Sequence, residues 1–295
     1  MQRVIASLSL LLASVGCFAD GSLVTLWQAD GARNTVYLLG SIHLLREQDH
    51  PLPAVIDKAY EDAEVIVMEI DMDDIDPIAT QTLFTQYGMI SDGRSLRDWM
   101  GEIAYSRAVE AAEKIDIPLH MMTGVEPWYA ALTIEVMALS RIGFDPNLGI
   151  ETWMTNKAAS DGKPIEGLET IEEQLGFLDG LSVPAQRQML LATLEEAASL
   201  EDMMDQLIDA WRSGDTGFLE AELLAAFAEY EELNQAILVD RNNRWVDQIT
   251  DLLDDDDDYL VVVGALHLIG DNGVPRQLES LGVPIRQLSE STPLR

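Results

Sequence analysis

Two stretches decide the fold: residues 36–43, with the sequence VYLLGSIH, and residues 259–267, with the sequence YLVVVGALH. In each, a short apolar run ends at a glycine, and a histidine follows the glycine by three positions. Continuous apolar runs of this length are typical of parallel strands that are buried on both faces. We therefore predict that the two stretches are neighbouring strands of one sheet and that His43 and His267 emerge at the same edge.

Two further strands are predicted between these repeats. Residues 63–70 are predicted to form a strand that is reached through a helix over about residues 53–62, and a strand–helix–strand unit favours a parallel sheet. Residues 163–169 are predicted to form another strand with its turn. The fold class that follows is α/β, with a central, mostly parallel sheet.

The remaining pattern is mainly helical. Residues 95–115 are predicted to be helical, and residues 117–122 to form a short strand. From about residue 171 to residue 253 the sequence has the period of amphipathic helices, which makes a large helical insertion before the last strand. We expect residues 20–295 to form one domain of this kind.

The composition excludes one class of partner. The chain has 295 residues, 47% of them hydrophobic, and a formal net charge of -34. Such a chain can bury a full core, but it lacks the clustered Lys and Arg that nucleic acid binding requires. The acidic excess is typical of a well-solvated surface, and it can also attract divalent cations or cationic peptides.

The first 19 residues predict export. A cation at Arg3 precedes an apolar run to about Val15 and small residues up to Ala19, which is the pattern of a signal peptide. An alternative is a lipid anchor on Cys17, the only cysteine. No later stretch reaches about 18 uninterrupted apolar residues, so we expect a periplasmic or secreted mature chain without a transmembrane segment.

The histidines at the two strand ends are the main candidates for chemistry. Ligands bind beyond the carboxyl ends of strands in open α/β sheets, and Glu69 stands at the end of the predicted strand 63–70. Two imidazoles and a carboxylate suit Zn, Mn, Fe or Co. A single histidine at a strand end is more often structural, but two in the same position of a repeated motif favour a joint role in metal binding or catalysis.

Glu169 is a second carboxylate at a predicted strand end. It is interpreted either as a further ligand or general base, or as an acid at the N-terminus of the following helix. Ser41 is not expected to be a nucleophile, because Ala265 holds the same position in the second repeat. The sequence contains no G-x-S-x-G, H-E-x-x-H or phosphate-binding loop motif.

These residues resemble a known family. The resemblance covers about residues 23–288 and rests on five ordered blocks, which are 37–43, 163–170 with Gln174, 210–215, Arg241 and Asn242 with Trp245, and 263–274. In this order the blocks are similar to the TraB/PrgY/GumN family, which includes the TIKI metalloproteases.

The resemblance implies a metal-dependent peptidase that acts on a peptide or protein substrate. It implies a divalent ion, such as Mn, Co or Zn, at His43, Glu69 and His267, with Glu169, Arg241 and Asn242 in catalytic support. Arg241 and Asn242 lie on a predicted helix, where the arginine has the alternative of simply pairing with an acid. Two other functions stay open: a non-catalytic peptide-binding or metal-binding protein, and an esterase-like hydrolase that uses a histidine base without metal.

The export prediction can be checked on protein from the cell envelope. N-terminal sequencing is expected to begin after Ala19, because the small residues before it form a cleavage site. A lipid-modified Cys17 would change the anchor and leave export in place. An intact Met1 on envelope protein would contradict the prediction.

Overall fold

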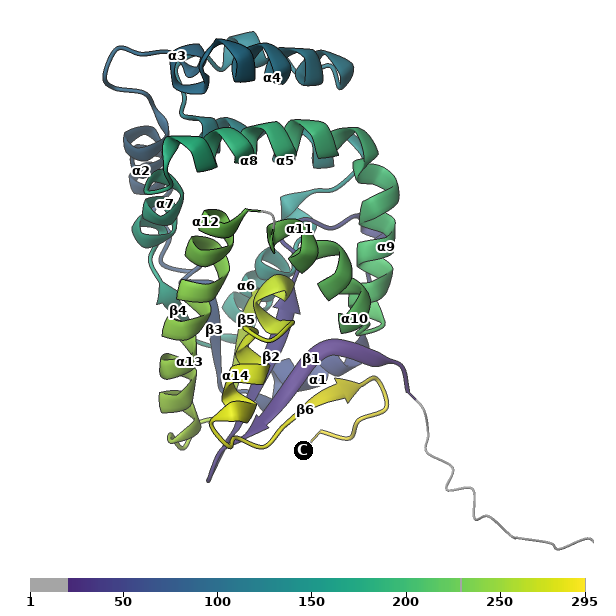
Figure 1. The fold of residues 1–295 in the computed structure, drawn as a ribbon. Coiled ribbons are helices and arrows are strands. Elements are labelled where there is room, and N and C mark those ends of the chain that lie inside the picture. The colour runs from purple at the N-terminus through teal and green to yellow at the C-terminus, as the bar shows by residue number, and fades with distance from the viewer. Residues whose placement is uncertain (1–20, 229, 295) are drawn as a thin grey trace, which may run out of the picture.

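The computed structural model describes residues 21–228 and 230–294, so the predicted signal peptide lies outside the described residues. A six-stranded sheet in the order β4-β3-β5-β2-β1-β6 forms its centre (Figure 1). The strands are β1 (Leu23–Asp30), β2 (Thr35–Ser41), β3 (Val65–Ile70), β4 (Ile165–Glu169), β5 (Tyr259–Gly264) and β6 (Ile285–Ser289). The strands β4, β3, β5 and β2 are parallel to one another, which confirms the predicted α/β class with a mostly parallel sheet.

The two repeated stretches are neighbours, as predicted. Strand β2 pairs with β5 in parallel, and the register places Gly40 opposite Val263 and Ser41 opposite Gly264. Every residue of β2 is buried, and so are the first five residues of β5. The antiparallel strands β1 and β6 were not predicted, and they extend the sheet beyond β2.

Helices make up most of the rest of the chain. The α-helices are α1 (Ala54–Asp62), α2 (Pro77–Gly88), α3 (Leu96–Met100), α4 (Glu102–Lys114), α5 (Pro127–Arg141), α6 (Ile150–Asp161), α7 (Ile171–Asp179), α8 (Val183–Glu196), α9 (Leu200–Arg212), α10 (Thr216–Leu219), α11 (Ala225–Ala228), α12 (Glu231–Asn234), α13 (Asp240–Leu253) and α14 (Val274–Ser280). Two π-helical turns, η5 (Glu220–Leu224) and η6 (Gln235–Val239), adjoin α11 and α13. The 3₁₀ turns are η1 (Glu47–Asp49), η2 (Leu119–Met121), η3 (Pro146–Leu148), η4 (Ala197–Ser199) and η7 (Ala265–Leu268).

The sequence predictions for residues 95–122 need two corrections. The predicted helix over 95–115 is broken into α3 and α4 at Gly101, whose φ of 71° interrupts the helical backbone. The predicted strand over residues 117–122 is wrong, because this segment forms the 3₁₀ turn η2 behind Pro118. Its apolar residues Ile117 and Leu119 pack into a helical cluster instead of pairing in the sheet.

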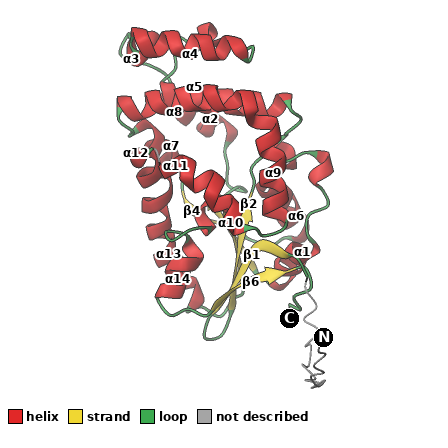
Figure 2. Ribbon diagram, turned by 45° about the vertical axis from the view of Figure 1, so that its right-hand side comes forward, coloured by secondary structure: helices red, strands yellow, loops and turns green. Residues whose placement is uncertain are grey.

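The apolar side chains of the sheet form a core on each face. In β2, Tyr37 and Leu39 pack with α1 and α6 on one face, whereas Val36 and Leu38 pack with α13 and α14 on the other. A third cluster joins α3, α4, α5 and α8. Figures 1 and 2 show α5 and α8 crossing beyond the carboxyl ends of the parallel strands, with α3 and α4 farther out.

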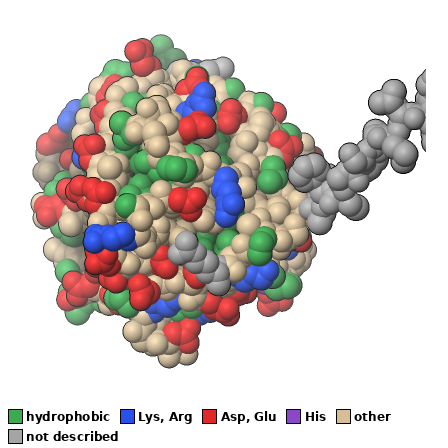
Figure 3. All heavy atoms as spheres, turned by 90° about the horizontal axis from the view of Figure 1, so that it is seen from below, with side chains coloured by type: hydrophobic (Ala, Val, Ile, Leu, Met, Phe, Trp, Pro, Cys, Tyr) green, Lys and Arg blue, Asp and Glu red, His purple; other side chains and the backbone are tan. Residues whose placement is uncertain are grey.

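The face that is turned downward in Figure 1 carries acidic, basic and apolar side chains. Figure 3 shows Asp and Glu side chains distributed over the face seen from below, among other types, instead of gathered in one patch. None of the helices in residues 21–228 and 230–294 combines the length and the hydrophobicity that a membrane crossing requires.

Helix α9 is hydrogen-bonded to the sheet at Gly40 and Thr25, through its residue Trp211. The indole N–H of Trp211 donates to the carbonyl oxygen of Gly40 at 2.7 Å, and the hydroxyl of Thr25 donates to the carbonyl oxygen of Trp211 at 2.6 Å. A Cβ atom on Gly40 would lie 2.6 Å from Thr25 Cγ2 and 3.0 Å from Ala265 Cα. The close packing of β1, β2 and η7 therefore requires glycine at this position.

A substitution tests this requirement. Gly40→Ala is expected to lower the free energy of unfolding by roughly 1–3 kcal/mol, because the new methyl group overpacks the contact with η7. Gly176→Ala in α7 is the matched control, because a Cβ there meets nothing within 4 Å and alanine favours a helix by about 0.4–1 kcal/mol. Urea unfolding of both variants measures the difference, and equal stability of the two would contradict the packing argument.

Candidate active site

The carboxyl ends of four parallel strands bring the predicted residues to one edge of the sheet. His43 follows β2, Glu69 lies near the end of β3, and His267 follows β5 within η7. A Cβ atom placed on Gly264 would lie 3.3 Å from Glu69 Oε1, 3.5 Å from His267 Cδ2 and 3.9 Å from His43 Nε2. The missing side chain of Gly264 thus leaves a small space that all three residues face.

His267 is a neutral imidazole with a fixed orientation. It is 4% exposed, and its Nδ1 lies 2.6 Å from Asn242 Oδ1. The Asn242 amide nitrogen donates to the carbonyl oxygen of Asn272 at 2.8 Å, so its oxygen faces the ring and accepts the Nδ1 proton. Burial lowers the pKa of His267 to about 3, although Glu69 opposes this effect. At neutral pH the lone pair is therefore on Nε2.

His43 is held from the other side, by a carboxylate. Its Nδ1 lies 2.8 Å from Glu151 Oε1, and the hydroxyl of Ser41 donates to the same oxygen. The Glu151 carboxylate raises the pKa of His43 well above its usual range, and because 62% of the His43 side chain is exposed, solvent screens part of the attraction. The hydrogen bond to Glu151 leaves Nε2 as the ring atom directed toward Gly264.

The two repeats differ in the backbone that follows their glycines and in the burial of their histidines. After β5 the chain enters the 3₁₀ turn η7, which buries His267, whereas after β2 it runs through a bend that leaves His43 exposed. The equal spacing of the histidines therefore predicts a shared edge but not a shared environment.

Glu69 is an ionised carboxylate whose two oxygens have different partners. The backbone N–H of Gly264 donates to Oε1 at 2.8 Å, and the Gln174 amide donates to Oε2 at 3.0 Å. Burial would raise the pKa of Glu69, but interactions with His267, Arg241 and His43 lower it to about 2. Because His267 is uncharged at neutral pH, the positive charge beside Glu69 comes from Arg241 and His43.

Glu169 binds Arg241 instead of a histidine. Its side chain is 2% exposed, and it accepts hydrogen bonds from Arg241 Nε at 3.0 Å and from the Gln174 amide at 2.9 Å. The helix that follows is capped by Thr170 and Glu173, so Glu169 does not serve as its N-terminal acid. Glu169 therefore holds Arg241 in place, a contact that neither interpretation from its position at the strand end predicts, and the supporting role that the family resemblance implies for it stays a prediction.

Arg241 connects the two carboxylates with His267. One Nη atom lies 2.5 Å from Glu69 Oε2, and the other lies 3.2 Å from His267 Nε2. The guanidinium group lies over the ring of Trp245 at 4.6 Å, and this ring also packs against His267 at 4.4 Å. The partners of Arg241 are thus buried acids of the site, not an acid of its own helix surface.

Sequence reasoning missed two residues that orient the site, Glu151 and Gln174, and gave no role to Ser41. Glu151 lies in the first turn of α6, where an acid is common for helix stability alone, so nothing in its spacing points to His43. Gln174 belongs to one of the blocks that carry the family resemblance, but that block gives it no role. Ser41, which was not expected to be a nucleophile, donates a hydrogen bond from its hydroxyl to Glu151.

The chemistry of these donors fits a divalent ion. No three His, Cys, Asp or Glu side chains of the described chain already stand at ligand spacing around one point, and His267 Nε2 is 3.9 Å from Glu69 Oε1. Both imidazoles, however, have Nδ1 held by an oxygen, and this arrangement presents Nε2 to a metal in many proteins.

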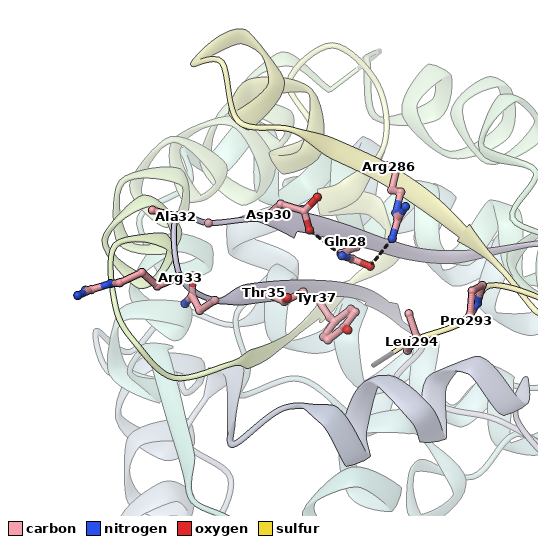
Figure 4. Close-up of a pocket in the computed structure, with 11 residues that line it drawn as sticks. Gln28, Asp30, Ala32, Arg33, Thr35, Tyr37, Arg286, Pro293 and Leu294 are labelled. Atoms are coloured by element: carbon pink, nitrogen blue, oxygen red, sulfur yellow. Dashed lines mark hydrogen bonds between the residues drawn. The ribbon is translucent and has the colours of Figure 1, made fainter.

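A separate polar hollow lies at the opposite end of the sheet. It measures about 340 Å³ and surrounds the β1–β2 connection near Thr35, whereas His43 follows the other end of β2. Figure 4 shows Gln28 between Asp30 and Arg286, with hydrogen bonds of 2.6 and 3.1 Å. None of the predicted site residues lines it.

Comparison with known proteins agrees with the blocks that carry the resemblance. The chain is similar to the uncharacterized protein YbaP of Escherichia coli (strain K12) and to that of Shigella flexneri. Each is 23% identical over 243 residues, which are 82% of this chain and 87% of the relative. No solved structure matches the chain. The model of the TraB/PrgY/gumN family matches residues 25–287, and the chain therefore belongs to this family.

Proposed function

We propose that this protein is an exported, metal-dependent hydrolase, and that its substrates are peptides. The observation that carries the proposal is the convergence of His43 Nε2, His267 and Glu69 Oε1 on the space beside Gly264. Family membership supports it, because this family includes the TIKI metalloproteases. The pattern of residues 1–19 supports a periplasmic or secreted location.

His43, Glu69 and His267 would hold the ion. When bound, a divalent ion supplies a Lewis acid that polarises a carbonyl group and makes a water molecule more acidic. The two imidazoles differ in what they need for binding. His267 already has a free lone pair on Nε2, whereas His43 must release a proton, because Glu151 raises its pKa.

The remaining roles belong to side chains of this chain. Glu69 Oε1 faces the Gly264 space and is either a ligand or the base that accepts a proton from water. Asn242 and Glu151 keep the two rings oriented through Nδ1. Arg241, held by Glu169, is the cation beside the site and would stabilise negative charge that develops on the substrate.

One observation favours a second candidate, a hydrolase without metal. Glu151 and His43 form a carboxylate–imidazole pair with Nε2 directed toward the site, which is how a histidine base is held in many hydrolases. In that case His43 would activate water directly. Hydrolysis that survives a strong chelator favours this candidate, whereas loss of hydrolysis and its recovery with Mn, Co or Zn favour the metal.

The ligand roles predict the effect of removing each histidine. His43→Ala and His267→Ala are expected to weaken ion binding by more than the roughly 10–100-fold that loss of an outer orienting residue costs, since a site with few ligands cannot easily lose one. Calorimetric titration of tag-free protein measures the affinity. His120→Ala is the matched control, because His120 is exposed on η2 and lies outside the repeats. Unchanged affinity in both site variants would exclude the proposed ligands.

Glu69→Gln separates the two roles of the carboxylate, because it keeps the shape and removes the charge. If Glu69 is the base, the ion stays bound and hydrolysis of a peptide library falls by roughly a hundredfold or more. If Glu69 is a ligand, ion occupancy falls as well. Elemental analysis and mass spectrometry of the products measure both quantities. Full occupancy with full hydrolysis would remove Glu69 from the mechanism, and bound metal without cleavage in the wild type would favour a binding protein.

A further inference from the structure

We propose that Arg241 is a built-in competitor of the divalent ion and sets how tightly the site holds it. The inference rests on the proposed metal-binding function and concerns the regulation of that same site. It comes from the contacts of one guanidinium group, which reach His267, Glu69 and Glu169 together.

The first argument is the lone pair of His267. Because Nδ1 donates its proton to Asn242 at 2.6 Å, Nε2 can only accept. Arg241 Nη1 lies 3.2 Å from Nε2, and arginine has only donors, so the guanidinium uses this lone pair. A metal ion needs the same lone pair, and a nitrogen atom cannot serve both at once. Arg241 and the ion therefore exclude each other at this atom.

The second argument is charge. Glu169 is buried and Glu69 is largely buried, with their side chains 2% and 13% exposed, and Arg241 lies between them with its side chain 7% exposed. A cation placed beside Glu69 neutralises part of the negative charge that attracts a divalent ion, and its effect is strong because little solvent screens it. Arg241 thus weakens ion binding through its charge as well as through its contact with His267 Nε2.

The third argument is that the contacts of Arg241 can separate. Its Nε atom is anchored to Glu169 at 3.0 Å, and its guanidinium group lies over Trp245 at 4.6 Å. A small rotation could release His267 and Glu69 while these two contacts remain. The competition would therefore be reversible, and it would favour an ion that exchanges with the solution over one that is held permanently.

Arg244 provides a matched control one helical turn away. Its Nη2 lies 3.4 Å from Glu169 Oε2, and its guanidinium group lies over the ring of Phe177 at 4.6 Å. It is also a cation beside Glu169, but its side chain is 47% exposed and has no hydrogen bond or ion pair with His267 or Glu69 among the described residues. Removing Arg244 therefore changes the net charge by the same amount without freeing the lone pair.

The experiment is calorimetric titration of chelator-stripped, tag-free protein with Mn²⁺ and Co²⁺. Arg241→Gln is expected to bind the ion roughly tenfold more tightly than the wild type or better, and Arg244→Gln within about threefold of it. Arg241→Lys is expected to bind several-fold more tightly than the wild type, because one ammonium group cannot bridge three partners. This variant decides the question if Arg241→Gln does not fold.

The outcomes separate this inference from the proposed function. Ion binding by Arg241→Gln but not by the wild type supports the competition. Equal or weaker binding by folded Arg241 variants overturns the competition while the metal site stands. An equal gain in ion affinity in Arg244→Gln overturns it too, because removal of any cation beside Glu169 would then explain the gain without the contacts of Arg241 to His267 and Glu69. If neither the wild type nor any variant binds an ion, both the competition and the metal-dependent function are excluded.

Discussion

The parallel pairing of β2 with β5 is the constraint on which the site depends. It joins segments from opposite ends of the chain and places Ser41 opposite Gly264, so that both histidines leave the sheet at one edge. Because β3 pairs with the other side of β5, the Glu69 carboxylate reaches the same space and accepts a hydrogen bond from the Gly264 backbone. A shift of this register would separate the three groups that the proposed function requires.

Buried charge is the second theme of the site. Glu169 and Arg241 are buried and Glu69 is largely buried beside them, and each has hydrogen-bond partners that offset part of the cost of leaving water. The two imidazoles are in different states, because burial keeps His267 neutral, with Asn242 fixing its tautomer, whereas the Glu151 carboxylate favours the charged form of His43. Similar motifs thus produce two unlike histidines.

The sequence predicted the parts of the fold that depend on local pattern. The apolar runs of β2 and β5 gave the central strands, and the helical period from residue 171 to residue 253 agrees with the helices between β4 and β5. Strand β6 was missed because its partner β1 lies at the other end of the chain, whereas β1 pairs with β2 across a short connection and its residues were not recognised as a strand. Residues 117–122 were misjudged because their apolar residues pack among helices, which no local pattern reveals.

The site was predictable to a similar extent. His43, Glu69 and His267 stand at strand ends, where position alone suggests a shared edge. The contacts of these residues could not be predicted in the same way. Ser41 donates to Glu151 across 110 positions, and Arg241 donates to Glu69 across 172. Such contacts are set by packing between distant elements, so the spacing of residues along the chain does not predict them, and only the family resemblance assigned Arg241 to the site.

The most direct test of the metal site is anomalous scattering from crystals of the tag-free protein soaked in Mn²⁺ or Co²⁺. The proposed function predicts one strong peak beside Gly264, about 2.0–2.2 Å from the Nε2 atoms of both His43 and His267. A crystal that shows peaks only elsewhere on the acidic surface, with none between these two histidines, would contradict it.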